Sequence, residues 1–302
     1  MALSRTFRNV AWVAALALAA GGPMLVGVGT AGGLPETADA AGAGEPGGTG
    51  KPAGTVEPAQ TAEPAPDAWP DHSAFDELLQ RYVSDAGVDY AAWHANAGDR
   101  ERLRTYLQTL SAAPVSELQE RANARPHALA YWLNLYNAVT LNFVLDGYPT
   151  DSIKDLGGMF SSPWKKKLVT VEGTELTLNE IENDIIRPRF REPRIHFALN
   201  CAAVSCPPLR AGAYVGESLD QQLEEQTVRF LADPRANRVG DNGRLRLSKI
   251  FDWYADDFRD AAGSVAQYVA PYLKDYPVDT DGVRIESNDY DWTLNDAGRA
   301  GS

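Results

Sequence analysis

Cysteine is scarce in this 302-residue sequence, which contains only Cys201 and Cys206. Two cysteines cannot build a scaffold of several disulfides, and they cannot supply a four-cysteine zinc site. Four familiar motifs are also absent from the sequence, namely His-Glu-x-x-His, Gly-x-Ser-x-Gly, a glycine-rich phosphate loop and Cys-x-x-Cys. No internal repeat is visible. The sequence therefore carries no signature of the enzyme and nucleotide-binding classes that these motifs mark.

Basic residues are outnumbered, because 28 Lys and Arg stand against 41 Asp and Glu and give a formal net charge of −13. Nucleic-acid affinity comes largely from Lys and Arg that neutralise phosphates, so we expect no nucleic-acid partner. Anionic membrane surfaces are disfavoured for the same reason. Hydrophobic residues make up 44% of the chain, which is enough for a core, and the length predicts one or two domains.

The first residues have the pattern of an export signal. Arg5 and Arg8 precede an apolar run over residues 10–20, which is shorter than the ~20 residues of a membrane-spanning helix. The triplet Ala-Asp-Ala at residues 38–40 resembles a cleavage site. We therefore predict a signal peptide over residues 1–40, or an uncleaved N-terminal anchor because the apolar stretch continues past residue 20. Either alternative predicts an extracytoplasmic location, periplasmic or secreted, with no membrane contact beyond that anchor.

Residues 41–68 consist mostly of Gly, Ala, Pro, Thr and Glu, with Val56 as their single large aliphatic residue. Such a segment cannot bury enough apolar surface to offset the entropy lost on ordering. We therefore predict a disordered linker over residues 41–68. Aromatic residues appear regularly from Trp69 onward, and we predict one globular domain over residues 69–297.

The most clearly helical segment is residues 127–145, which follow Pro126 and are apolar almost all round. A helix without a polar face belongs in the centre of a domain. Further helices are expected over residues 72–83, 103–110, 115–122, 178–187, 219–231, 249–259 and 265–273. Strands are expected over residues 167–177 (a hairpin turning at Glu172-Gly173), 194–200, 244–248 and 283–286. The fold predicted is a mostly helical α+β domain around a small, mainly antiparallel sheet.

The segment from Arg194 to Arg210 places polar and reactive groups at the end of the predicted strand over residues 194–200. Two cysteines with four residues between them in an exported protein most often form a disulfide. The Cα separation of a disulfide, ~4.4–6.8 Å, is easily reached across such a turn. A disulfide between Cys201 and Cys206 is therefore expected, and a reactive thiol or two inert buried thiols remain as alternatives.

A thiol enzyme with Cys201 as nucleophile would need a base, and His196 and His127 are the candidates. Side chains alternate along a strand, so His196 and Asn200 would share one face while Cys201 lies on the other. A straight strand therefore separates His196 from Cys201. All four histidines precede Cys201, which excludes the Cys-then-His order of papain-like and transglutaminase-like enzymes.

Two asparagines lie in the apolar helix, and Asn134 and Asn137 share one of its faces. A buried carboxamide without a partner costs ~1–3 kcal/mol, so each must be hydrogen-bonded. They bind backbone at a loop or strand end, or they line a pocket with His196 and Asn200.

Arg187 ends a helix rich in charged residues. It belongs to a solvated face with weak ion pairs, or it points inward and binds a carboxylate in bidentate fashion. No metal site is expected, because nothing in the spacing of His72, Asp71 and His196 demands one.

The chain resembles the family of domain of unknown function 547 in three segments: YWLNLYNAVTLNFVL, TLNEIENDIIRPRF and EPRIHFALNCAAVSCPPLR. Three further segments, HSAFDELLQRYVSDAGVDY, KIFDWYADDF and YDWTLN, resemble its exported bacterial members. The recurrent elements of that family correspond here to Trp132, Asn134, Tyr136 and Asn137 on the helix and to residues 197–201 on the strand. An Ile-Glu pair is a further family element, and the resemblance therefore implies Glu182 rather than Glu180 as a pocket residue. The family name assigns no activity.

Together these patterns predict an exported domain that binds a small molecule or peptide, or has a structural role, with no cofactor. Its polar pocket would lie between the asparagine-bearing helix and the His196–Cys201 strand. The pocket residues expected are Asn134, Tyr136, Asn137, Glu182, Arg187 and Asn200. The alternative is a thiol-dependent enzyme, either a hydrolase or transferase or a thiol-disulfide exchange factor, with Cys201 as nucleophile and His196 as base.

Overall fold

The computed structural model describes residues 68–158, 162–240, 244–273 and 285–299. All of them belong to one of the two compact units of the chain, Thr61–Ser302. The predicted signal peptide or anchor (1–40) and all but the last residue of the predicted linker (41–68) lie outside the described residues. Within the described ranges, no helix combines the length and hydropathy that crossing a membrane requires.

The N-terminal part of the described chain is helical. Its helices are α1 (Ser73–Tyr82), α2 (Tyr90–Ala95), α3 (Ala97–Ala112), α4 (Val115–Leu118) and α5 (Ala124–Gly147). Short polar side chains cap two of them, because Asp89 accepts a hydrogen bond from the backbone N–H of Ala92 and Asn96 accepts one from Asp99. Helix α2 is not among the sequence predictions, whereas α1 and α3–α5 fall on predicted segments.

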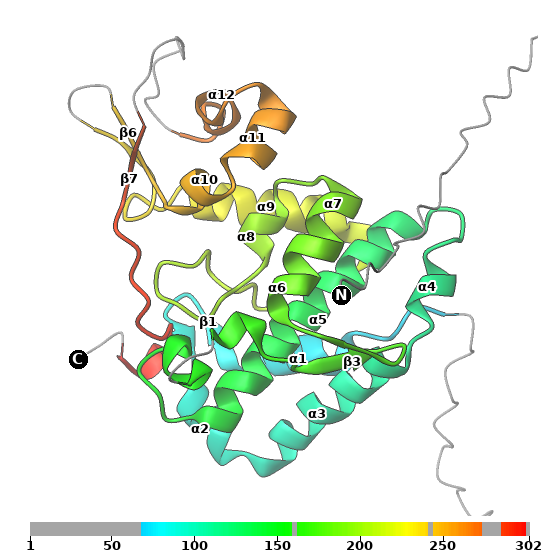
Figure 1. The fold of residues 1–302 in the computed structure, drawn as a ribbon. Helices are drawn as coiled ribbons and strands as arrows, with labels where there is room; N and C mark the ends of the chain where they lie inside the picture. The colour runs from blue at the N-terminus through cyan, green and yellow to red at the C-terminus, as the bar shows by residue number, and fades with distance from the viewer. Residues whose placement is uncertain (1–67, 159–161, 241–243, 274–284, 300–302) are drawn as a thin grey trace, which may run out of the picture. The chain divides into compact units, whose positions relative to one another are not determined.

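Helix α5 is the centre of the larger hydrophobic core. Every side chain from Ala128 to Leu141 is buried, so the helix has no polar face. It is covered by α2, α3 and α9 (Leu219–Leu231), and Figure 1 shows it enclosed among these elements. The prediction of a central apolar helix over residues 127–145 is confirmed, with the helix extended by one turn at its start.

A hairpin leads into the helical segment that faces the site. Strands β3 (Val169–Val171) and β4 (Thr174–Leu176) pair antiparallel, and the turn residues Glu172 and Gly173 have φ angles of 47° and 76°. The following α6 (Leu178–Glu180) opens with a capping box between Thr177 and Glu180.

Helix α6 continues into a π-helical turn, η3 (Ile181–Ile186), and then into α7 (Arg187–Phe190). In η3 the backbone N–H of Arg187 bonds the carbonyl of Glu182, five residues back. The predicted helix over residues 178–187 therefore forms, with one extra residue in its middle turn.

The strand predicted over residues 194–200 is wrong. Residues Ile195–Ala198 form a short helix, α8, and the chain becomes extended only at Leu199. A short apolar run has no periodicity that separates a buried strand from a buried helical turn. The separation of His196 from Cys201, argued from the alternation of a strand, therefore does not apply.

The C-terminal part of the domain has a core of its own, with Phe197, Phe230, Phe251 and Phe258 among its buried residues. Its elements are α9, α10 (Ile250–Trp253), α11 (Ala255–Ala262), α12 (Val265–Val269), β5 (Arg238–Val239), β6 (Leu245–Leu247) and β7 (Ile285–Ser287). Strand β6 pairs antiparallel with β5 and parallel with β7. Figure 1 shows these strands beside α10–α12.

The segment after β7 runs back along the domain, as Figure 1 shows, toward β1 (Val83–Ser84) and β2 (Gly87–Val88). Leu294 bridges to Ala203, and the backbone N–H of Val88 bonds the carbonyl of Asn295. A Cβ at Gly87, where φ is +121°, would collide with that carbonyl, so the turn requires glycine. The C-terminal segment thus joins the first helices to the cysteine loop.

The fold class predicted from the sequence is confirmed. The described residues contain short 3-10 turns, η1 (Ile153–Gly157), η2 (Pro163–Lys165), η4 (Gly216–Ser218) and η5 (Ala297–Arg299), besides the helices. The strands belong to three separate sheets of two or three strands, mostly antiparallel. The sheet content is therefore distributed around a helical core rather than gathered in one central sheet.

Candidate functional site

A cavity of about 260 Å³ lies where α5, η3, α8, α10 and the C-terminal segment meet. Six Trp and Tyr side chains are among its lining residues. The lining residues are Tyr136, Trp164, Asn179, Glu182, Asn183, His196, Leu199, Cys201, Cys206, Pro207, Ile250, Trp253, Tyr254, Tyr290 and Trp292. A wall so rich in aromatic rings, with few polar groups, is typical of a small-molecule site.

His196 stands in this wall and is held by two neighbours. Its Nε2 lies 2.7 Å from Oδ2 of Asp257, and its ring stacks on Tyr254 with the centroids 3.8 Å apart. Arg187 donates two further hydrogen bonds to the same carboxylate, at 2.8 and 2.9 Å. Although burial acts to raise it, the hydrogen bonds from His196 and Arg187 hold the pKa of Asp257 well below its usual range. An ionised carboxylate only accepts, so Nε2 of His196 is the donor.

Arg187 therefore binds a carboxylate in the bidentate manner that the sequence suggested, and that carboxylate is the protein's own Asp257. The hydrogen bonds to Asp257 raise the pKa of the Arg187 guanidinium above its usual value. With Arg187 paired to it, the charge of Asp257 is neutralised. Arg187 acts behind the wall, where it fixes the Asp257–His196 pair.

Glu182 is the one carboxylate of the cavity lining in the described chain. It is buried, and it makes no ion pair with another described residue. The hydroxyl of Tyr136 points to its Oε2 from 3.5 Å. Burial, followed by the negative charge of Glu182, raises the pKa of Tyr136 and of Tyr254 well above the usual range, so both phenols are neutral at pH 7. The negative charge of the cavity is thus concentrated on Glu182.

Both sulfur atoms face the same cavity. The structure places Cys201 and Cys206 at disulfide distance, as their spacing predicts, with the Cα atoms 6.1 Å apart. The Tyr290 hydroxyl lies 3.2 Å from each sulfur, and the backbone N–H of Cys201 lies 3.0 Å from Sγ of Cys206. His196 and Cys201 therefore line one hollow, although the strand geometry assumed from the sequence would have kept them apart.

The asparagines lie behind this wall. Asn134 bonds the backbone carbonyl and N–H of Tyr214, and Asn137 bonds the carbonyl of Ala198 and the N–H of Asn200. Their amides are satisfied by backbone, and within the described residues neither lines the aromatic cavity; Tyr136 is the residue of α5 that does. The Asn200 side chain bonds Pro207 and Ala202 and so shapes the cysteine loop.

His127, the other base considered for Cys201, lies at a different place. Its ring stacks on Trp69, and its Nδ1 is 3.9 Å from Glu217. It is not among the described residues that line the cavity. Among the described residues, no group of three His, Cys, Asp or Glu side chains is arranged to hold a metal ion.

Sequence reasoning missed much of the site. Asp257 and the aromatic residues of the wall, except Tyr136 in α5, come from segments in which no chemical motif was visible. The sequence segments that hold them, FDWYADDF and YDWTLN, are dense in aromatic residues flanked by Asp. This density of aromatic residues among acidic ones is the sequence signal that points to a cavity lined by aromatic rings.

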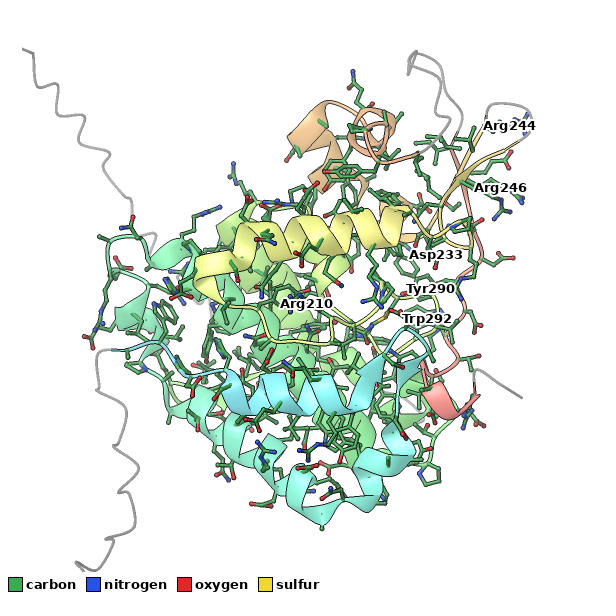
Figure 2. The ribbon with its side chains drawn as sticks, turned by 180° about the vertical axis from the view of Figure 1, so that it is seen from behind. Arg210, Asp233, Arg244, Arg246, Tyr290 and Trp292 are labelled. Atoms are coloured by element: carbon green, nitrogen blue, oxygen red, sulfur yellow. A yellow bond between two sulfur atoms is a disulfide. The ribbon has the colours of Figure 1, made fainter. Side chains whose placement is uncertain are left out.

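A second, larger hollow of about 440 Å³ also borders the cysteine loop and shares Cys206 and Tyr290 with the first. Figure 2 shows Tyr290 and Trp292 on the C-terminal segment below the end of α9, where Asp233 lies. Within the hollow, Arg235 pairs with Asp233. It brings together fewer aromatic rings than the smaller cavity, which is therefore the better candidate site.

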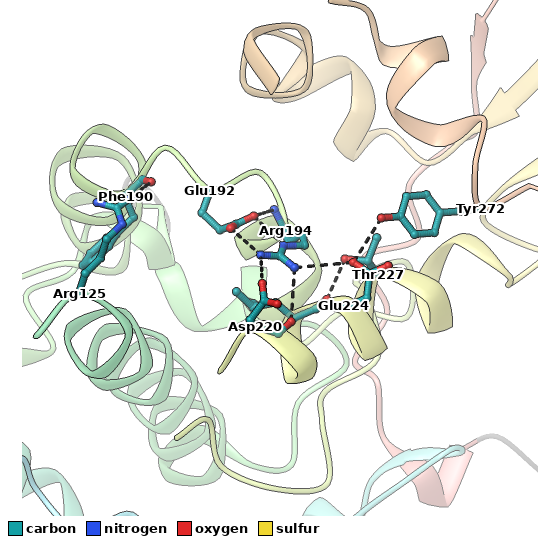
Figure 3. Close-up of polar contacts among 9 residues, drawn as sticks. Arg125, Phe190, Glu192, Arg194, Asp220, Glu224, Thr227 and Tyr272 are labelled. Atoms are coloured by element: carbon teal, nitrogen blue, oxygen red, sulfur yellow. Dashed lines mark hydrogen bonds and ion pairs between the residues drawn. The ribbon is translucent and has the colours of Figure 1, made fainter. Parts of the chain in front are cut away.

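The start of α8 is fixed from outside the cavity by Arg194. Its guanidinium bonds Glu192 and Asp220 at 2.8 Å and lies 3.7 Å from Glu224, which accepts a hydrogen bond from Tyr272 (Figure 3). The hydrogen bond to Glu192 raises the pKa of Arg194 above its usual value. These contacts join α8 to α9 and so hold one wall of the site in place.

Comparison with known proteins gives one match. Residues 120–231 fit the sequence profile of a family described as "Protein of unknown function, DUF547". No curated protein and no solved structure matches the chain. The matched region includes Glu182, His196 and both cysteines. The residues Trp253, Tyr254, Asp257, Tyr290 and Trp292 of the site and its support lie beyond it.

Proposed function

Because the chain belongs to the DUF547 family, whose description assigns no activity, we propose its function from the cavity alone: it binds a small organic cation. The observation that carries the proposal is Glu182, a buried carboxylate without an ion-pair partner among the described residues, in a hollow walled by aromatic rings. The lining described above contains no Lys or Arg. A ligand that carries a positive charge supplies the ion-pair partner for Glu182.

The aromatic wall supports the same conclusion. Trp253 lines the cavity and is 45% exposed, and its ring packs against Tyr290 and Trp292 with centroids 4.8 and 5.9 Å away. Indole and phenol faces attract ammonium groups, with about 0.5–2 kcal/mol for each contact. Lys154 already shows this preference, because its Nζ lies 3.8 Å above the ring of Trp292.

The volume limits the ligand to a small molecule. About 260 Å³ is slightly below the usual range of drug-sized pockets, about 300–1,000 Å³, and suits a compact ammonium compound better than a peptide. We further propose that the domain works outside the cytoplasm, which the N-terminal sequence pattern and the paired cysteines support.

The test uses choline and its uncharged isostere 3,3-dimethylbutan-1-ol, with tryptophan fluorescence or calorimetry as the readout. Choline should bind, and the isostere should bind at least about tenfold more weakly, because it lacks the charge that Glu182 and the rings attract. Equal affinity for the two compounds contradicts the proposal.

The variant Glu182→Gln should weaken choline binding at least about tenfold. Asp184→Asn is the matched control, because Asp184 is an exposed carboxylate in the same π turn, and choline binding should not change. Equal losses in the two variants would mean that the net charge of the surface, rather than the cavity, attracts the ligand.

The thiol-dependent enzyme stands as the second candidate. The described residues contain no free cysteine, so a thiolate nucleophile ready to attack is not supported. What favours sulfur chemistry is the position of the Cys201–Cys206 pair in the wall of the ligand cavity.

A further inference from the structure

We propose that the Cys201–Cys206 disulfide is a reactive bond, opened when a low-molecular-weight thiol enters the aromatic cavity and attacks Sγ of Cys201. Structural disulfides are usually sequestered from thiols, whereas this one forms part of a cavity wall. The inference rests on the proposed function in two respects, because it takes the same cavity as the entry route and the charge of Glu182 as the basis of selection among thiols.

The direction of attack follows from exposure. Cys201 is partly exposed, whereas Cys206 is buried, with 7% of its surface accessible. Thiol-disulfide exchange needs access to the attacked sulfur along the S–S axis. An incoming thiolate therefore reaches Cys201, and Cys206 is the sulfur that leaves.

The surroundings of Cys206 favour its departure as a thiolate. Two donors are directed at its Sγ, the backbone N–H of Cys201 at 3.0 Å and the Tyr290 hydroxyl at 3.2 Å. Hydrogen bonds to a thiolate lower the pKa of the thiol, and a leaving thiol of lower pKa leaves faster. Burial raises the pKa of Tyr290, so its hydroxyl keeps the proton that it donates.

The exchange balances with thiols alone. A thiol first loses its proton to solvent, and the resulting thiolate forms a bond to Sγ of Cys201. The S–S bond breaks, and its electron pair leaves with Cys206. A second thiolate then attacks the small molecule's own sulfur in the mixed disulfide and releases the Cys201 thiolate, which, like that of Cys206, takes a proton from solvent. Two thiols are oxidised to a disulfide, and the protein disulfide is reduced to two thiols.

The charge of the cavity selects among thiols. Glu182 should favour an aminothiol such as cysteamine over the neutral 2-mercaptoethanol and the anionic 3-mercaptopropionate, once each rate is corrected for thiol pKa. An order of cysteamine, mercaptoethanol, mercaptopropionate, with steps of about three- to tenfold, is expected. In Glu182→Gln the three corrected rates should converge.

The main experiment treats the oxidised full-length protein with each thiol, quenches with acid, alkylates free thiols with N-ethylmaleimide and locates every adduct by peptide mass spectrometry. We expect the mixed disulfide on Cys201 and alkylation on Cys206. An adduct on Cys206, opening that requires denaturant, or alkylation of both cysteines before any thiol is added would each overturn the proposal.

The variant Tyr290→Phe tests the leaving group. Loss of one donor to the departing thiolate should slow opening by 2-mercaptoethanol roughly three- to tenfold. Tyr131→Phe is the matched control, because its hydroxyl donates to the backbone carbonyl of Leu110 and Tyr131 is not among the described residues that line the cavity, so the rate should not change. Urea unfolding of both variants verifies that each is folded. An unchanged rate in folded Tyr290→Phe contradicts the role assigned to Tyr290.

The experiments test the cation-binding function and the reactive disulfide independently of each other. If choline does not bind but 2-mercaptoethanol still forms the adduct on Cys201, the cation-binding function is wrong and the reactive disulfide stands. If choline binds but no thiol opens the bond in the folded protein, the reactive disulfide is wrong and the cation-binding function stands.

Discussion

The side chain of Asn137 in α5 spans the end of α8, where it donates to the carbonyl of Ala198 at 3.0 Å and accepts from the backbone N–H of Asn200 at 2.9 Å. Both hydrogen bonds are buried. Asn137 thus fixes the point at which the chain leaves α8 and enters the cysteine loop. A side chain outside the cavity therefore determines where His196 and Cys201 stand in its wall.

Replacement of this side chain should destabilise the protein strongly. Asn137→Ala leaves one backbone N–H and one carbonyl without partners in the core, and we expect the free energy of unfolding to fall by about 2–4 kcal/mol. In Asn142→Ala, the control on the same helix, only a bond to the exposed Asp146 is lost, and the change should stay within about 0.5 kcal/mol. Urea denaturation measures both values, and similar losses would contradict the role of Asn137.

Asp257 should contribute far more to the free energy of unfolding than its neighbour Asp256. Asp257→Asn removes a charge that binds Arg187 and His196, and we expect a loss of about 1–3 kcal/mol in the free energy of unfolding. Asp256→Asn affects one exposed ion pair with Arg259 and should cost less than about 0.5 kcal/mol. Thermal or urea unfolding of the two variants at pH 7 measures whether Asp257→Asn loses more stability than Asp256→Asn.

His72 should make the protein sensitive to mild acid. Burial lowers the pKa of His72 from 6.5 to about 4, and its Nδ1 is 2.7 Å from the Tyr106 hydroxyl. The unfolded chain takes up a proton near pH 6.5 while the native His72 does not, so stability falls as the pH drops from about 6.5 toward 4. The slope is at most about 1.4 kcal/mol per pH unit. His72→Gln should flatten the unfolding free energy over this range, and an unchanged slope would exclude His72 as its source.

The disulfide should contribute to stability even if thiols can open it. The double variant Cys201→Ser/Cys206→Ser should lose about 2 kcal/mol relative to the oxidised protein, because the bridge closes a short loop. Iodoacetamide should label neither cysteine in the native protein until a reductant is present. Rapid labelling of the untreated protein would show that the thiols are free.

The sequence was sufficient to predict most helices, and the reason lies in their length. Residues 127–145 and 219–231 are long enough for apolar periodicity to be decisive, and α5 and α9 form there. Residues 194–200 are too short for that, and the apolar side chains Ile195 and Phe197 fit a strand or a helical turn equally well. Packing against α9 and Asn137 selects the helical turn.

The site was only partly predictable, because a cavity depends on contacts between distant segments. Glu182, His196 and the cysteines are conspicuous in the sequence by type or by resemblance. Trp253 and Tyr290 have no chemical motif; Trp253 reaches the cavity at the end of α10, and Tyr290 reaches it only because the C-terminal segment runs back along the domain. Nothing in the spacing of residues shows that return path.

The π turn η3 also constrains how the chain can change in length. The backbone N–H of Arg187 bonds the carbonyl of Glu182 five residues back, whereas an α-helical turn joins residues four apart. Removing one residue between them would therefore leave an α turn with both side chains on the same side of the helix, and removing a second would rotate them relative to each other by about 100°. A descendant that keeps the pocket can therefore lose at most one residue from this turn.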